Sequence, residues 1–388
     1  MSDISHFFKP VETKEDLEPD SGTFSNIIKS YKGDNFPDLE DLDIAFFGVL
    51  EDRSAVSNSG SAAAPNVIRN CLQGLYPTGF NPKIADLGNI EPGHTVKDTY
   101  FAVSAVVEYL VKKNIVPIIL GGSQDLSFAQ FLGYQNLEQT INVCSIDSTF
   151  DLGIANENLN NRSFLGKIIL HQPNFLFNYS VLGYQSYLVS QNGLEMMEKL
   201  YFDTYRLGQV RHNVSESEPI IRHADMLTFD FSSVRYSDAP GTEHASPNGF
   251  YAEEACQMMR YAGMNDKITS LGLYELNPNF DKRGKTAALA AQMIWCFLEG
   301  YYQRKKDYPS RSNPDYTRFH VFLENNRYEI NFFRSLKTDR WWMEVPYPPD
   351  KNIRFERHTL IPCSVKDYEM ACKDEIPDRW WQTYQKLF

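Results

Sequence analysis

Two aspartates that follow an apolar run in the middle of the chain are the residues best suited to chemistry. The run spans Ile141 to Ile146, and Asp147 and Asp151 come after it with Thr149 midway between them. Carboxylates at the C-terminal end of a buried strand are typical of an active site in an α/β protein. A histidine between them would favour Mn or Zn over Mg. Thr149 stands in that place, so the segment has the pattern of a metal site without its nitrogen ligand.

Four other polar segments belong to the same predicted site. Most of them also follow a strand-like apolar run, so we expect them at the carboxyl edge of one parallel sheet. Three aspartates from two strands would cluster there, and clustered carboxylates repel each other unless a cation or protons neutralise them. The segments are Gly121-Gly122-Ser123-Gln124-Asp125, Asp230-Phe231-Ser232, Ala239-Pro240-Gly241-Thr242 and Glu275-Leu276-Asn277-Pro278.

The elements that position these residues alternate between strands and helices. This alternation predicts an α/β fold with a mostly parallel sheet and helices on both faces. Residues 1–40 are polar and predict an N-terminal arm or loosely packed cover, followed by an α/β domain at 41–306. The predicted strands are 44–50, 84–88, 115–120, 141–146, 179–182, 226–231 and 267–274, and the predicted helices are 66–75, 100–113, 127–132, 251–262 and 285–305.

An aromatic-rich extension is predicted at 307–388. Three short alternating runs at 318–323, 328–333 and 341–345 predict an antiparallel meander, which makes the extension β-rich. The word Asp-Arg-Trp-Trp occurs twice, ending in Trp341-Trp342 and in Trp380-Trp381. These four indoles are expected either to seal the extension onto the main domain or to contact a partner.

The composition excludes several classes of partner. Of the 388 residues, 38 are basic and 50 acidic, so the net charge of −12 argues against nucleic acids and anionic membranes. Six scattered cysteines without a CxxC pair are typical of reduced thiols in a cytoplasmic protein. The N-terminus lacks the pattern of a signal peptide, and no stretch approaches the ~20 apolar residues of a membrane span. We therefore expect a cytoplasmic protein with no membrane insertion.

The motifs resemble the arginase/ureohydrolase family, specifically its formimidoylglutamase-like members, from about residue 44 to 302. The resemblance implies a doubly wound arginase-like sheet, assembly as trimers or hexamers, and hydrolysis of amidine C–N bonds. The matching segments are 60–69 (GxxxGPxxIR, with Ala64 for a glycine), 84–88 (DLGD), 239–250 (APGxSxPxPGG), and 275–287 with Glu275, Asn277, Asp281 and Thr286 (ExNPxxDxxxxTA). Asp281 and Thr286 are interpreted as structural residues at the start of a helix.

The metal-binding motifs of the family are altered in this chain. The family binds two Mn ions through GGDHS, DAHxD and SxDxD, and here Gln124, Thr149 and Ser232 replace two histidines and an aspartate. Asp147, Asp151 and Asp230 remain as metal candidates. These departures from the family motifs predict no cofactor, with one Mn, Mg or Ca ion on oxygen ligands as the alternative.

Other residues complete the predicted pocket. By resemblance, Glu275 holds the position that binds the guanidinium or formimino group of the substrate, although it could equally buttress an arginine or the backbone. His244 and Asn277 are the further ligand-pocket candidates. His244 and His171 are the histidines nearest the motifs, and a lone histidine at such a place is more often a hydrogen-bonded structural residue than a metal ligand. His94 is interpreted as a turn residue.

These observations favour a catalytically inactive protein with a ureohydrolase fold, which acts by binding as a scaffold or regulatory partner. A protein partner or self-association is expected, together with a small amidine or amino-acid ligand. The alternative is a formimidoylglutamase-like amidine hydrolase with a single or altered metal site. A third hypothesis is a structural oligomer with a vestigial pocket. No catalytic residue is assigned.

Overall fold

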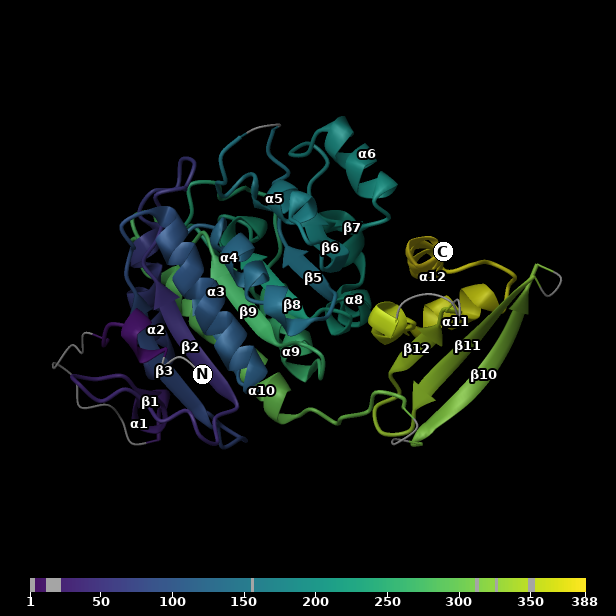
Figure 1. Ribbon diagram of the computed structural model, residues 1–388, viewed down its shortest axis with the longest axis horizontal. Helices are drawn as coiled ribbons and strands as arrows, with labels where there is room; N and C mark the ends of the chain where they lie inside the picture. The colour runs from purple at the N-terminus through teal and green to yellow at the C-terminus, as the bar shows by residue number, and fades with distance from the viewer. Residues whose placement is uncertain (1–3, 12–21, 155–156, 311–313, 325–326, 348–352) are drawn as a thin grey trace.

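Nine parallel strands form the main sheet of the protein (Figure 1). The computed structural model describes residues 4–11, 22–154, 157–310, 314–324, 327–347 and 353–388. The strand order is β1-β3-β2-β4-β9-β8-β5-β6-β7. Their bounds are β1 (Lys29–Ser30), β2 (Ile44–Val49), β3 (Ile84–Ile90), β4 (Val116–Leu120), β5 (Ile141–Ile146), β6 (Leu176–Tyr184), β7 (Asp203–Arg206), β8 (Met226–Asp230) and β9 (Ser270–Tyr274). The central strands are buried along their whole length, as their continuous apolar runs require.

Helices cover both faces of this sheet and enclose two separate apolar cores. One face carries α2 (Ala64–Gln73), α8 (Ser217–Arg222), α9 (Ala252–Met264) and α10 (Lys285–Tyr302). The other carries α3 (Val96–Lys112), α4 (Leu126–Leu132) and α5 (Phe164–Leu170), of which α3 lies in front of the sheet in Figure 1. The remaining helices of this domain are α1 (Phe24–Ile27), α6 (Gln191–Lys199) and α7 (Leu207–His212). The predicted doubly wound, arginase-like α/β fold is confirmed.

The strand order changes direction in the middle of the sheet. The first strands of the chain lie on one side and β5, β6 and β7 on the other, while β9 and β8 fill the space between β4 and β5. In open α/β sheets, the crevice outside the carboxyl ends of the strands at such a switch point is the usual binding site. The loops that follow β4, β9, β8 and β5 therefore meet at one edge, and these loops carry the predicted site.

Part of the stretch predicted as an N-terminal arm packs against the main sheet. Residues 29–30 form β1, which pairs with the outer side of β3. Phe24 and Phe8 are buried in the two cores, and the backbone of Lys9 exchanges hydrogen bonds with Asn89 in β3. This stretch closes one edge of the sheet.

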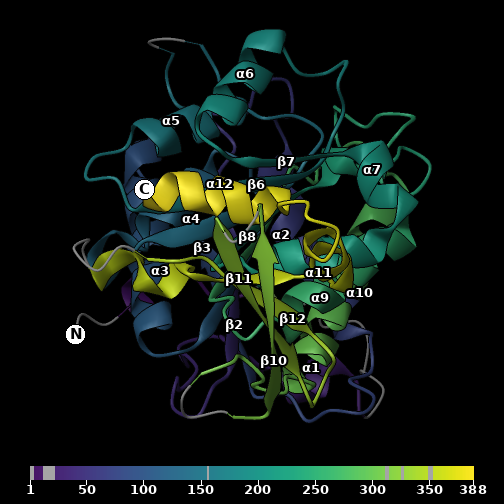
Figure 2. The ribbon, with the colours of Figure 1, turned by 90° about the vertical axis from the view of Figure 1, so that its right-hand side faces the viewer.

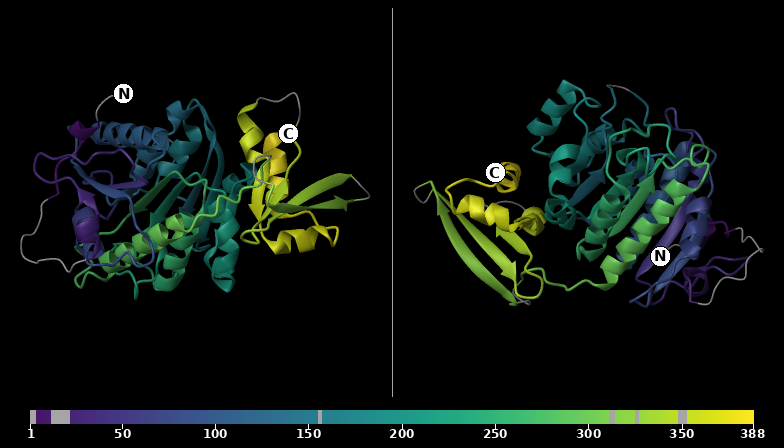
Figure 3. Two further views of the ribbon diagram at one scale, coloured as in Figure 1. Left: turned by 90° about the horizontal axis from the view of Figure 1, so that it is seen from below. Right: turned by 180° about the vertical axis from the view of Figure 1, so that it is seen from behind.

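The extension folds into a separate antiparallel sheet of four strands, which confirms its β-rich character. It contains β10 (Tyr316–Leu323), β11 (Tyr328–Ser335), β12 (Trp341–Glu344) and β13 (Leu360–Cys363), with α11 (Val365–Ala371) and α12 (Asp378–Leu387). Figure 2 looks onto this sheet and α12, and Figure 3 shows the single segment that joins it to α10. Sequence patterns predicted three of these strands, and β13 is the fourth.

Aromatic packing and charged contacts hold the extension to the main domain. Arg222 of α8 donates to the carbonyl oxygens of Trp341 and Cys363, and its guanidinium lies 4.4 Å from the ring centre of Trp342. Trp341 and Trp380 are buried inside the extension. Among the four tryptophans, Trp381 is the exposed one, so contact with a partner stays a prediction that rests on this residue.

No helix in the described segments has both the length and the apolar content needed to cross a membrane.

Candidate functional site

A cavity of about 340 Å³ opens at the carboxyl ends of β5, β8 and β9. Its floor contains the carboxyl groups of Asp151, Asp230 and Glu275, one from the end of each strand. Its rim is formed by segments that the sequence motifs only partly indicated, around Arg162 and around His244. The predicted acidic cluster thus exists and faces a space large enough for a small molecule.

The loop after β4 brings Gln124 against this cluster. Gly121 and Gly122 have φ values of +75° and +80°, and a Cβ on Gly122 would lie 2.7 Å from the carbonyl oxygen of Glu51. Only glycine allows this close turn. The turn places the backbone N–H of Gln124 2.7 Å from Glu275 Oε1 and its side-chain Nε2 2.8 Å from Asp147 Oδ2. Gln124 therefore donates hydrogen bonds to two of the clustered acids, Glu275 and Asp147.

Asp125, the last residue of the same motif, points to a different environment. Tyr100 donates to its Oδ2 at 2.5 Å, and Ser123 donates to its Oδ1. Burial raises the pKa of Asp125 to about 7. Asp125 does not line the cavity wall formed by the described residues, so it does not replace a missing ligand.

Thr149 donates hydrogen bonds to both Asp147 and Asp151. The backbone N–H of Thr149 donates to Asp147 Oδ1 at 3.0 Å, and its hydroxyl donates to Asp151 Oδ1 at 2.8 Å. The negative charge of Asp147 raises the pKa of Asp151 beyond the effect of burial. Thr149 thus serves as a hydrogen-bond donor at the position where the family has a metal ligand.

Asp230 and Ser232 close the opposite side of the floor. The backbone N–H of Ser232 donates to Asp230 Oδ1 at 2.6 Å. The hydroxyl of Ser232 lies 3.1 Å from the hydroxyl of Ser148, which follows β5. Ser232 stands where the family motif has its last aspartate. Its hydroxyl therefore links the ends of β8 and β5 by an uncharged contact.

Burial sets the electrostatics of the cluster. It raises the pKa of Asp147, Asp151, Asp230 and Glu275 above their ordinary values. The negative charge of Asp147 adds to the effect of burial on Asp151 and Asp230. The charge of Arg162 opposes this effect at Asp151, whose pKa stays raised because burial and Asp147 outweigh it. The site therefore favours any positive charge that enters it.

Glu275 is held by amide groups around it. It follows β9 with a left-handed backbone, φ +68°, which is a strained conformation for this residue type. Its carboxylate accepts from Asn58 Nδ2 at 2.7 Å and from Asn161 Nδ2 at 3.2 Å, besides the N–H of Gln124. Glu275 thus accepts from two side-chain amides and one backbone N–H, and it also lines the cavity. Asn277 lies behind it and donates to Asn58 Oδ1 and to the carbonyl oxygen of Ser59.

The rim combines groups of both charges. Arg162 Nη2 lies 2.9 Å from the ring nitrogens of His244, and Glu243 lines the same opening. Burial, together with the charge of Arg162, lowers the pKa of His244 and so favours the neutral ring. Asn161 and Arg162 were not predicted. They follow an asparagine-rich segment with no strand before it, so no sequence pattern marked them.

Neither His171 nor His94 reaches the cavity. His171 ends α5 and packs between the rings of Phe128, Phe131 and Phe175. His94 lies in the exposed bend before α3, where its carbonyl oxygen accepts from Arg53. Asp281, predicted to be structural, accepts from the backbone N–H groups of Thr286 and Ala287 and so caps α10.

The donor set of this site does not fit two manganese ions. Within the described part of the chain, no three His, Cys, Asp or Glu side chains are arranged to hold a metal ion. An amide N–H and a hydroxyl point at the carboxylates from the positions at which the family motifs have histidines. Two ions would have to share the carboxylates of Asp147, Asp151 and Asp230 without any imidazole ligand.

Comparison with known proteins identifies relatives across most of the chain. The model of the Arginase family matches residues 42–299, and the extension lies outside the match. A formimidoylglutamase of Staphylococcus epidermidis is 25% identical over 295 residues, covering 71% of this chain and 94% of that protein. A formimidoylglutamase of Staphylococcus aureus is 23% identical over 300 residues, covering 72% and 96%.

Solved structures share the fold. The formiminoglutamase of Trypanosoma cruzi with Mn²⁺ superposes with a TM-score of 0.64 at 20% identity, covering 70% of this chain and all of that one. The formimidoylglutamase of Bacillus subtilis gives a TM-score of 0.65 at 19% identity, covering 77% and 98%.

Proposed function

Because this chain belongs to the arginase family, we propose that it uses the pocket of that fold to bind a small cationic ligand without metal-dependent hydrolysis. In this proposal the protein acts through binding, as a scaffold or regulatory partner. The observation that carries it is the hydrogen bond from Gln124 Nε2 to Asp147 Oδ2 at 2.8 Å. This bond gives a buried acid a protein partner in place of an ion.

The chemistry of the ligand follows from the charges of the cavity. Three carboxyl groups lie on its floor, and burial disfavours their ionised forms. A planar amidinium or guanidinium would supply positive charge and several N–H donors to them. Arg162 at the rim would pair with a carboxylate at the other end of the same molecule. An amidine that also carries an amino-acid or carboxylate group therefore fits both ends.

Calorimetric titration tests this binding with L-arginine and N-formimidoyl-L-glutamate as probes. We expect saturable binding of at least one probe and no release of product. Asp230→Asn should weaken it about tenfold or more, because a charge-assisted hydrogen bond is lost. Asp339→Asn, in the exposed ion pair with Arg334, is the matched control and should leave binding unchanged. Absence of binding by both probes would refute the proposal.

A second candidate function is hydrolysis of an amidine C–N bond, and the relatives support it. Proteins named formimidoylglutamase match this chain over more than nine tenths of their own length. An enzyme of this kind would convert N-formimidoyl-L-glutamate and lose its activity on chelation. Turnover that survives repeated purification and rises with added manganese would favour this candidate over the first.

A further inference from the structure

A second cavity, of about 320 Å³, lies between the main sheet and the C-terminal extension. It is at the amino-terminal edge of the strands, where Lys267 precedes β9 and His223 precedes β8. The extension supplies the opposite wall with Trp342, Arg357 and Leu360. The family match at residues 42–299 includes the wall that the main domain supplies and excludes the wall that the extension supplies.

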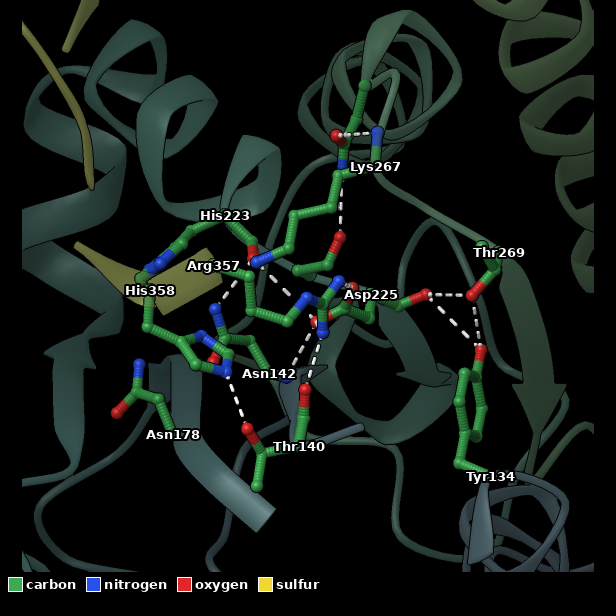
Figure 4. A network of polar contacts seen from close by, with 12 residues as sticks. Tyr134, Thr140, Asn142, Asn178, His223, Asp225, Lys267, Thr269, Arg357 and His358 are labelled. Carbon is green, nitrogen blue, oxygen red and sulfur yellow. Dashed lines mark hydrogen bonds and ion pairs between the residues drawn. The ribbon is translucent and has the colours of Figure 1, made fainter. Parts of the chain in front are cut away.

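A network of polar contacts forms one end of this cavity (Figure 4). Asp225 is buried and binds Arg357 Nη2 through its Oδ1 at 2.5 Å. Lys267 Nζ lies 3.5 Å from Asp225 Oδ2 and donates to the carbonyl oxygen of His223 at 2.9 Å. Figure 4 shows Lys267 and Arg357 approaching Asp225 from the main domain and the extension.

At this end of the cavity, two positive groups share one acid. Lys267 and Arg357 line the cavity and both pair with Asp225, which does not line it. Arg222, the third cation in the wall, is paired with Glu218 at 2.9 Å. The acids in its wall are Asp266 and Asp307. Asp307 is already paired, with Arg340 at 3.6 Å and with the hydroxyl of Thr338. Burial raises the pKa of Asp266, which reduces its charge. The end of the cavity at Lys267 and Arg357 therefore has two positive groups on a single acid, in a protein of net charge −12.

Two buried polar atoms in this wall, His223 Nε2 and Asp266 Oδ1, have no hydrogen-bond partner among the described residues. His223 is 4% exposed, and among the described residues its Nε2 makes no hydrogen bond. Its other ring nitrogen lies 3.5 Å from Arg379. Buried polar groups are nearly always satisfied, so an atom of this kind beside a cavity indicates a missing partner.

The other walls of the cavity are apolar. Trp342 and Tyr308 face it together with Leu360 and Pro362. Arg222 covers the ring of Trp342 at 4.4 Å, which brings a positive charge next to an aromatic surface. A fully hydrated inorganic anion would leave these walls without contacts, whereas an organic acid would cover them.

We propose that this cavity binds a small organic carboxylate with an aromatic or branched apolar body. Its acid group would lie near Lys267 and Arg357, within reach of His223 Nε2, and its body against Trp342. The ammonium of Lys267 has three N–H groups. Among the described residues, Asp225 and the carbonyl oxygen of His223 accept two of them, so the third can donate to the acid group of the ligand. The ligand would contact the main domain and the extension together, so its binding would stabilise their association.

Titration of the full chain with 3-phenylpropionate tests the proposal, with 3-phenylpropanol as the uncharged analogue of the same body. We expect saturable binding of the acid, observed by calorimetry, and binding of the alcohol at least about tenfold weaker. Lys267→Gln should weaken binding of the acid by a similar factor. Absence of saturable binding, or equal affinity for acid and alcohol, would overturn the proposal.

Two further variants locate the site. Leu360→Trp would fill the cavity from the start of β13 and should abolish binding even if Lys267→Gln proves too unstable to measure. Arg162→Gln, at the rim of the first cavity, should leave the affinity for 3-phenylpropionate unchanged. Loss of binding in Arg162→Gln with retention in Leu360→Trp would place the acid in the first cavity and refute the proposal for the second.

Discussion

Replacing Gln124 by leucine removes the amide that donates a hydrogen bond to Asp147, while nearly conserving side-chain volume. Gln124 and Asp147 are each 1% exposed, and their hydrogen bond measures 2.8 Å. Hydrogen bonds to charged groups contribute about 1.5–3 kcal/mol, and a buried acid without its partner bears the full cost of desolvation. We therefore expect the free energy of unfolding to fall by about 2 kcal/mol. For 388 residues this corresponds to a fall in Tm of about 2–3 °C.

The assay is thermal and urea unfolding of both proteins after chelation, with and without added manganese. Gln257→Leu is the control, because its amide bonds to Tyr261 at an exposed position on α9 and should matter little. A metal that binds the native state stabilises it by about 2.7 kcal/mol at one hundred times its Kd. If manganese stabilised the unmodified protein by that amount, or if Gln124→Leu cost nothing, the reasoning would be refuted.

Three other outcomes are expected. Restoring the family ligands with Gln124→His, Thr149→His and Ser232→Asp should raise the affinity for manganese, measured by equilibrium dialysis. No gain in affinity would mean that the backbone at this site differs from the geometry of the family. Arg357→Gln leaves Asp225 buried with Lys267 at 3.5 Å, so it should cost about 2–3 kcal/mol in urea unfolding, against under about 0.5 kcal/mol for the exposed Arg334→Gln. Burial lowers the pKa of Lys267 to about 8 from its usual value near 10.5. The unfolded chain therefore binds more protons above pH 8, and stability relative to Lys267→Gln should rise by up to about 1.4 kcal/mol per pH unit between pH 8 and 10.5. A flat difference over this range would contradict the burial of the ammonium.

The central strands could be predicted because burial on both faces demands continuous apolar runs. β5 begins and ends at the predicted residues, and β4 and β8 differ by one. β7 was missed because this edge strand reads Asp-Thr-Tyr-Arg and pairs on one side only. β13 was missed because it contains Pro362. Proline argues against a central strand, but an edge strand such as β13 tolerates it.

The acidic cluster could also be predicted, since strand ends in a parallel sheet meet at one edge. Asp151, Asp230 and Glu275 do line one cavity. The contacts made by the substituted positions could not be predicted, because they depend on side-chain directions that no spacing encodes. Gln124 could equally have pointed away from Asp147. Asn58 and Asn161, which hold Glu275, come from loops whose course depends on tertiary packing.

We propose that hydrogen bonds from Gln124 and Thr149 take the place of metal ions in this family member. The most direct test is the manganese content per chain, measured by plasma mass spectrometry after incubation with excess manganese and desalting. We predict a content close to zero. A content of one or two ions per chain would contradict the claim and favour an amidine hydrolase.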